Sequence, residues 1–196
     1  TLDSLSTSAV SLSDIAETQS IQMQKQINAL KKFSDDIQEL SSLENSLSDI
    51  YEMEMINANY FCESVMNSVR DKIQPGVTVM VNAINMQVKT NPVQLNKILS
   101  HLLENAAIHT QSGKIMLDYK KRGAHTHQFI VTDNGPGIPA ERQENLFKPF
   151  AEIKDLTQGD GLGLPICSLI AIKMNGNLTL DTSYTRGCRF VLELHV

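Results

Sequence analysis

Residues 132–150 read TDNGPGIPAERQENLFKPF, and they join the end of a predicted strand to a turn rich in Gly and Pro. The residues at 127–133 indicate a strand that ends at Asp133, directly before turn-forming glycines. Gly135 and Gly137 let the backbone approach a flat ligand closely, and the carboxylate before them can accept hydrogen bonds from an exocyclic amine. A DNGPG sequence on its own, however, is usually only a turn.

Two segments on either side of this stretch carry related chemistry. HLLENAAIHT (101–110) has helical spacing, and Asn105 in its middle has an amide oxygen that can bind Mg²⁺. GDGLGLPIC (159–167) places three glycines before a helix, where bare backbone N–H groups suit phosphates. Taken alone, a mid-helix asparagine is usually solvated, and a GxGLGL sequence is a weak phosphate signal.

The rest of the pattern predicts one α+β domain over residues 48–196. It favours a two-layer α/β sandwich, in which a mixed sheet carries helices on one face. Alternation predicts strands near 51–55 and 77–81, and 113–121 and 127–133 resemble a hairpin around Gly123. Two further strands are predicted near 177–181 and 188–195. Helices are predicted near 57–73, after a capping Asn57, near 91–109, opened by Asn91-Pro92, and near 165–174, after the Gly-rich stretch.

The first 47 residues follow a different pattern and contain neither Gly nor Pro. Apolar residues recur at steps of three and four, which suits packing of one helix on another. Ser11, Ser13 and Asp14 favour a break or an N-cap, so a helical hairpin is predicted over 1–47. Because so thin a hairpin cannot bury its own apolar stripe, we expect it to pair with a second copy into a four-helix bundle.

Composition excludes several classes of function. The chain has 17 Lys and Arg against 22 Asp and Glu, a net charge of −5, and no basic cluster, which argues against nucleic-acid binding. No apolar run approaches the roughly 20 residues needed to span a bilayer. Cys62, Cys167 and Cys188 are odd in number and form no CxxC, as expected of reduced thiols in a cytoplasmic protein.

The order and spacing of four segments resemble a known family. They are similar to the N, G1, F and G2 boxes of the superfamily of histidine-kinase, gyrase and heat-shock chaperone ATPases, and are found at 101–110, 132–139, 146–150 and 159–167. ELSSLE (39–44) resembles the end of the second dimerisation helix of a sensor histidine kinase. FAEIKDLTQGDGLGLPIC (150–167) is similar to sensor kinases common in Bacteroidetes.

This resemblance implies a role for each matching position. Asn105 takes the place of the Mg²⁺-binding asparagine, and Asp133 takes that of the adenine-reading aspartate. Phe147 and Phe150 take the place of residues that anchor a lid over the nucleotide. The nucleotide-binding residues implied in this way are Asn105, His109, Asp133, Gly135, Gly137, Phe147, Phe150, Gly159, Gly161, Leu162, Gly163 and Leu164.

Three positions depart from the family pattern. The family usually has Asn where this chain has His101, Lys or Arg where it has Ile108, and Tyr or Phe where it has His109. The first two normally help with Mg²⁺ and phosphate, so weak Mg²⁺-ATP binding is expected, whereas an imidazole at His109 can still stack near a ribose. None of the five histidines lies in 1–47. The phospho-accepting histidine is therefore expected upstream of Thr1 in a longer parent, unless that parent never had one.

The sequence thus predicts the core of a two-component histidine kinase. It would bind Mg²⁺-ATP and transfer the γ-phosphoryl group to a histidine on the dimerisation helices of a homodimer, for relay to a response-regulator receiver domain. We expect the chain to be the cytoplasmic part of a membrane-anchored sensor. As a fragment without the acceptor histidine, it is expected not to autophosphorylate. One alternative, supported by His101 and Ile108, is a degenerate nucleotide-binding scaffold or switch without kinase activity. A chaperone- or gyrase-type ATPase is disfavoured because ELSSLE (39–44) resembles a dimerisation helix and because the lid segment is short.

Overall fold

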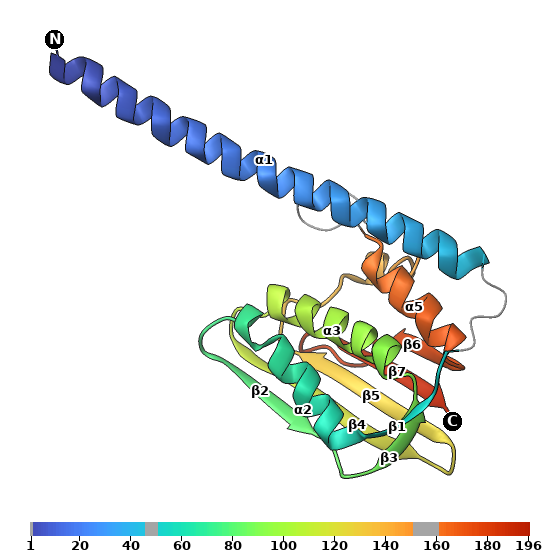
Figure 1. Cartoon of the computed structure of the whole chain (residues 1–196). Helices are drawn as coiled ribbons and strands as arrows, with labels where there is room; N and C mark the ends of the chain where they lie inside the picture. Colours follow the sequence, from blue (N-terminus) through green and yellow to red (C-terminus); the bar gives the residue numbers. More distant parts are fainter. Residues whose placement is uncertain (1, 46–50, 151–160) are drawn as a thin grey trace.

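A long N-terminal helix and a layered α/β domain make up the chain (Figure 1). The computed structural model describes residues 2–45, 51–150 and 161–196, with side chains in the first range from residue 16 onward. The predicted domain boundary at 47/48 lies outside these residues.

The N-terminal helix, α1 (Leu2–Asn45), runs unbroken for 44 residues (Figure 1). The predicted hairpin is therefore wrong. Ser11, Ser13 and Asp14 do not interrupt the helix, since such residues cost at most about 0.7 kcal/mol each in a helix interior. Breaking a helix usually takes Gly or Pro, and the segment has neither.

A five-stranded mixed sheet forms one layer of the α/β domain. Its strand order is β2 (Val77–Asn82), β4 (Gly113–Arg122), β5 (Thr126–Asp133), β7 (Arg189–His195) and β6 (Gly176–Leu180). β2 and β4 are parallel, and the other neighbours are antiparallel. Thr132 pairs with Arg189, so the last residue of β5 meets the residues that enter β7.

Helices cover one face of this sheet (Figure 1). They are α2 (Ala58–Ser68), followed by the 3₁₀ turn η1 (Arg70–Lys72), then α3 (Pro92–His109) and α5 (Gly163–Lys173). The short α4 (Ala140–Gln143) lies in the segment between β5 and α5. A separate antiparallel pair, β1 (Glu54–Asn57) with β3 (Gln87–Thr90), leads into α2 and α3. Asn57 caps α2 through the Asn59 and Tyr60 N–H groups.

The core lies between the sheet and α2, α3 and α5. Leu99, Leu103 and Phe129 are among its fully buried side chains. Burial alternates along β7, as expected of a strand with one face on the core. The predicted two-layer α/β sandwich, with a mixed sheet and helices on one face, is confirmed.

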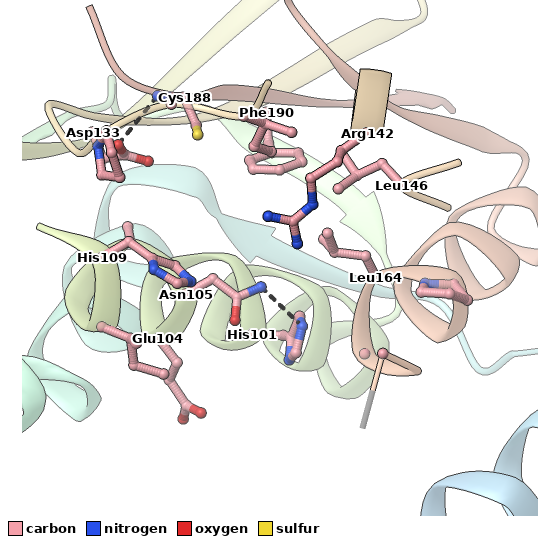
Figure 2. Close-up of a pocket in the computed structure, with 18 of the residues that line it drawn as sticks. His101, Glu104, Asn105, His109, Asp133, Arg142, Leu146, Leu164, Cys188 and Phe190 are labelled. Carbon is pink, nitrogen blue, oxygen red and sulfur yellow. Dashed lines mark hydrogen bonds between the residues drawn. The ribbon is translucent and has the colours of Figure 1, made fainter. Parts of the chain in front are cut away.

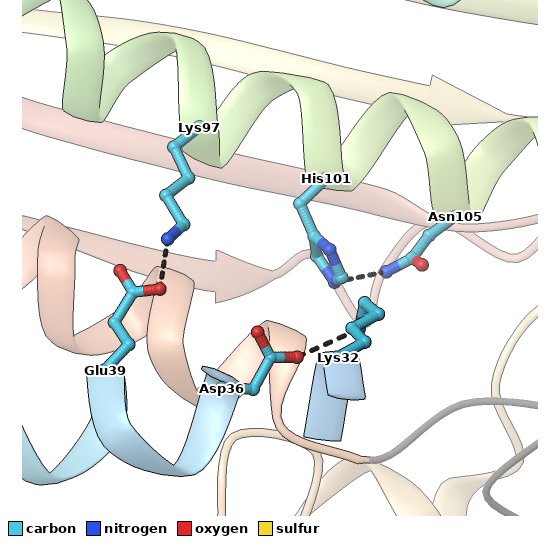
Figure 3. Close-up of polar contacts among 6 residues, drawn as sticks. All are labelled: Lys32, Asp36, Glu39, Lys97, His101 and Asn105. Carbon is cyan, nitrogen blue, oxygen red and sulfur yellow. Dashed lines mark hydrogen bonds and ion pairs between the residues drawn. The ribbon is translucent and has the colours of Figure 1, made fainter. Parts of the chain in front are cut away.

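The C-terminal half of α1 packs against the domain. Leu40 and Leu43 are buried, and α1 contacts α5. The Phe33 ring meets the Phe150 ring edge-on, with centroids 6.4 Å apart. Glu39 forms an ion pair with Lys97 of α3 (Figure 3). This packing brings α1 to the rim of the cavity described next.

Candidate functional site

A cavity of about 540 Å³ lies between α3, the segment after β5 and the start of α5. Its volume falls in the usual range for small-molecule sites, about 300–1,000 Å³. Figure 2 shows Asp133 and Cys188 at one end, Arg142 and Leu164 at the other, and Asn105 between them. Segments far apart in the sequence therefore meet at one cavity.

Asp133 closes the first end of the cavity. Its carboxylate is buried, and Oδ1 accepts hydrogen bonds from the backbone N–H groups of Gly135 at 2.8 Å and Cys188 at 3.1 Å. Burial raises the pKa of this carboxyl above its usual value, whereas the two hydrogen bonds and nearby His109 act to lower it. The two bonds fix Oδ1, so Oδ2 is the oxygen that can accept a hydrogen bond from a ligand.

Gly187 allows the strand ends around Asp133 to approach closely. A Cβ at Gly187 would lie 2.1 Å from the Asp133 carbonyl oxygen, and its φ of +135° is one that side chains rarely adopt. The neighbouring Cys188 is a free cysteine that lines the cavity. Burial raises the pKa of its thiol to about 11, so the group is uncharged beside Asp133.

Asn105 lies in the middle of the cavity, on α3. Its Nδ2 lies 3.1 Å from Nε2 of His101, one helical turn earlier (Figure 2). When Nε2 is the acceptor, this bond uses the Asn105 nitrogen and leaves Oδ1 for a ligand. The His101 ring packs against Gly163, where an added Cβ would lie 2.0 Å from Cε1. His101 thus joins α3 to the first turn of α5.

The end of α3 supplies little charge to the cavity. Ile108 is 70% exposed and lines the rim without a polar group. Glu104 also lines the cavity, but it forms an ion pair with Lys72 at 2.6 Å. His109 lies close enough to Asp133 to lower the pKa of that carboxyl.

Three cations line the cavity instead. Arg142, on α4, extends its guanidinium into the space above Leu164 (Figure 2). Lys148 also bonds the Asn145 Oδ1 at 2.8 Å, and Lys32 comes from α1. The sequence analysis missed Arg142, although it follows the GIP sequence by three residues. Lys32 had no sequence signal, because its position depends on the docking of α1.

The structure brings most of the residues implied by the family resemblance to one place. Those that line the cavity are Asn105, His109, Asp133, Gly137, Gly161, Gly163 and Leu164. The Gly135 N–H donates to Asp133, and Leu162 is fully buried at the N-cap of α5. Phe147 packs edge-on against the cavity residue Phe190, and Phe150 packs on Phe33. Gly159 lies outside the described residues.

A family profile described as "Histidine kinase-, DNA gyrase B-, and HSP90-like ATPase" matches residues 90–196. The chain belongs to this family. The match begins at the end of β3 and covers the cavity segments on α3, after β5 and on α5.

Curated proteins similar to this chain include sensor kinases. The sensor histidine kinase RcsC of Escherichia coli K12 is 32% identical over 126 residues, which are 62% of this chain and 12% of RcsC. The alginate biosynthesis sensor protein KinB of Pseudomonas aeruginosa is 32% identical over 111 residues, 56% of this chain and 18% of KinB. The chain therefore spans less than a fifth of the length of these relatives.

Solved histidine kinases share the fold. AdeS of Acinetobacter baumannii superposes with a TM-score of 0.69 at 21% identity, over 87% of this chain and 80% of that one. Together with the family match and the relatives, this makes the domain a histidine-kinase ATP-binding domain. Within the described residues, no helix combines the length and apolar character needed to cross a membrane.

Proposed function

We propose that the chain binds Mg²⁺-ATP as the kinase core of a two-component sensor. Its cavity would orient the γ-phosphoryl group for transfer to a histidine on the dimerisation helices, for relay to a response-regulator receiver domain. The observation that carries this proposal is Asp133, a buried carboxylate with Oδ1 fixed by two backbone N–H groups. It lies at one end of a cavity whose other end is the start of α5.

Asp133 is suited to reading adenine. The exocyclic amine of adenine donates hydrogen bonds, and Oδ2 of Asp133 is an acceptor facing the cavity. Guanine presents a carbonyl oxygen at the corresponding position, which a carboxylate repels. The Gly135 and Cys188 N–H groups favour the charged form of Asp133 that this role requires. The proposal therefore includes selection of ATP over GTP.

The start of α5 is suited to phosphate. Gly161 and Gly163 expose backbone there, and the N-cap residue Leu162 makes no side-chain hydrogen bond to the first turn. The helix dipole favours an anion beside the N–H groups of that turn. Arg142 and Lys148 add positive charge on the opposite wall.

The residues also fit Mg²⁺ when it arrives with the nucleotide. Mg²⁺ prefers oxygen ligands and usually takes few from the protein, with phosphates and waters completing its shell. Asn105 offers one amide oxygen in the cavity, since its nitrogen is bonded to His101. The metal would offset phosphate charge, while the protein's own part in phosphoryl transfer is mainly to position the groups.

The partners are proposed from the family and from α1. No histidine lies on α1, so the proposed transfer requires an acceptor histidine outside this helix. Exposed apolar side chains at Met23, Ile27 and Leu30 follow one face of α1 and fit a homodimer contact along it. We place the domain in the cytoplasmic part of a membrane-anchored sensor. The alternative, a degenerate scaffold, is not favoured, because Arg142 and Lys148 supply charge that Ile108 lacks.

Calorimetric titration of ATP and GTP into the full chain, each with and without Mg²⁺, tests the proposal. We expect ATP to bind in the micromolar range, more tightly with Mg²⁺, and GTP to bind at least tenfold more weakly, as about 1.4 kcal/mol of discrimination gives. Equal affinities would remove the adenine-reading role of Asp133. Absence of binding by either nucleotide would overturn the proposed function.

A further inference from the structure

α1 contributes directly to the cavity. Ala29 and Lys32 line it, and both lie on the face of α1 that turns toward the domain, together with Phe33 and Leu40. The spacing of these residues follows one side of a helix. A helix outside the family match, which begins at residue 90, thus forms part of the wall of the nucleotide cavity.

Lys32 places its own ammonium group at this wall. Its Nζ lies 2.9 Å from Oδ2 of Asp36, one helical turn onward, and its side chain is 60% exposed. Figure 3 shows Lys32 and Asp36 facing the α3 side chains His101 and Asn105. His101 packs on Gly163 at the start of α5. Lys32 is therefore at the end of the cavity where the phosphates are proposed to bind, away from Asp133.

We propose that Lys32 of α1 binds the phosphate groups of the nucleotide, so that nucleotide binding and docking of α1 strengthen each other. This inference rests on the proposed function. In this role, Lys32 of α1 supplies a positive charge that Ile108 does not provide. The charge then comes from the N-terminal helix rather than from the α/β domain. By linkage, any contact that the nucleotide makes only with docked α1 raises the population of the docked state.

The contact with Asp36 does not prevent this role. Asp36 is only 18% exposed, but the Lys32 side chain is 60% exposed, so water screens the ammonium. An ion pair between residues four apart on a helix then contributes little, because two side chains must also be held in place. A phosphate group carries more charge than a carboxylate, and an ammonium has three donors that can serve both partners. Asp36 would then compete with the phosphates for Lys32.

A purely structural role for Lys32 predicts a different outcome. If Lys32 only braces α1 through Asp36, loss of either partner has the same effect. If Lys32 binds phosphate, loss of Lys32 weakens nucleotide binding, whereas loss of the Asp36 charge strengthens it. The opposite signs distinguish the two roles.

The experiment is calorimetric titration of ATP into the full chain, with adenosine measured by competition against ATP. We expect Lys32→Ala to weaken ATP about fivefold, the factor of one exposed charge pair, and to leave adenosine unchanged. Lys32→Arg should restore most of the affinity, and Asp36→Asn should tighten ATP about twofold. Lys31→Ala is the matched control, since Lys31 is exposed on the same helix and does not line the cavity.

Three results would overturn the inference. They are unchanged ATP affinity in Lys32→Ala, an equal loss of adenosine affinity in that variant, and weakening of ATP by Asp36→Asn. Each can occur while the wild-type chain binds ATP and adenosine normally, which leaves the proposed function standing. A wild-type chain that binds neither ligand would instead reject the proposed function itself.

Discussion

The two ends of the cavity are built in different ways. At the Asp133 end, the site consists of two strand ends held together by backbone hydrogen bonds, from Gly135 and Cys188 to one carboxylate oxygen. At the α5 end, side chains from α1, α3, α4 and α5 meet, and the Asn105–His101 and Lys32–Asp36 contacts are between side chains. The first end is specified by local sequence, and the second depends on how separate helices pack. Substitutions at the first end should therefore cost more.

The largest expected effect is a loss of stability on substitution of Gly187, at the Asp133 end. Gly187→Ala should lower the free energy of unfolding by about 2–4 kcal/mol, because the added Cβ meets the Asp133 carbonyl and the backbone φ is unfavourable. Gly123→Ala is the control: its φ is also positive, at +72°, but nothing lies within 4 Å of an added Cβ. That variant should lose only about 1 kcal/mol. Urea denaturation measures both, and equal losses would show that the strand ends can separate.

The next effect is on adenine binding. Asp133→Asn replaces the acceptor Oδ2 by a group that can place an N–H opposite the N–H of the base. We expect ATP affinity to fall by about 1–3 kcal/mol, the usual cost of an unpaired buried polar contact. Asp71→Asn, at an exposed position on η1, should leave the affinity unchanged. Unchanged calorimetric affinity in Asp133→Asn would exclude the adenine-reading role.

A smaller gain in affinity is expected at Ile108 on the cavity rim. Ile108→Lys adds a cation to the cavity rim and should tighten Mg²⁺-ATP about fivefold, corresponding to about 1 kcal/mol. Val93→Lys is a matched control, because Val93 is on the same helix, is equally exposed and does not line the cavity. Adding His101→Asn should tighten binding further if both positions face the nucleotide. If neither variant gains affinity, the phosphates are held by other residues.

The smallest expected effect concerns pH. Burial, the largest influence on Asp133, raises the pKa of its carboxyl in the folded state. A raised pKa means that Asp133 contributes most to stability below its unfolded pKa, and that this contribution is lost as the pH rises through the folded pKa. Asp133→Asn should therefore be slightly more stable than the wild type at neutral pH, and this advantage should shrink in acid. Denaturation at pH 3 and pH 7 checks the sign, and a less stable variant at pH 7 would contradict it.

Local patterns predicted the layered domain because its elements are marked by residues with clear backbone consequences. Asn57 and Pro92 begin helices at or next to their predicted positions, and the hairpin predicted around Gly123 located the strand that ends at Asp133. The sequence also placed Asn105 and Asp133 in related segments, which the structure brings to one cavity. These predictions depend only on neighbours along the chain.

The remaining features depend on distant contacts. The predicted hairpin over 1–47 failed because weak helix formers were taken as a break, although a continuous helix tolerates them. Lys32 and Arg142 could not be identified as cavity residues, since their placement follows from how α1 and α4 pack. Gly187 is one of ten glycines in the chain, and only its contact with Asp133 distinguishes it.

The unbroken length of α1 has a mechanical consequence. At about 1.5 Å per residue, 44 residues make a rod of about 66 Å, stiff enough to carry a twist from one end toward the other. A screw displacement by one residue turns the rod by about 100°. Displacement in one direction would bring Lys31 to the place of Lys32 and keep an ammonium at the cavity. Displacement in the opposite direction would bring Phe33 there and replace the ammonium by an aromatic ring. The sense of rotation, rather than its size, would then set the charge that α1 presents to the nucleotide.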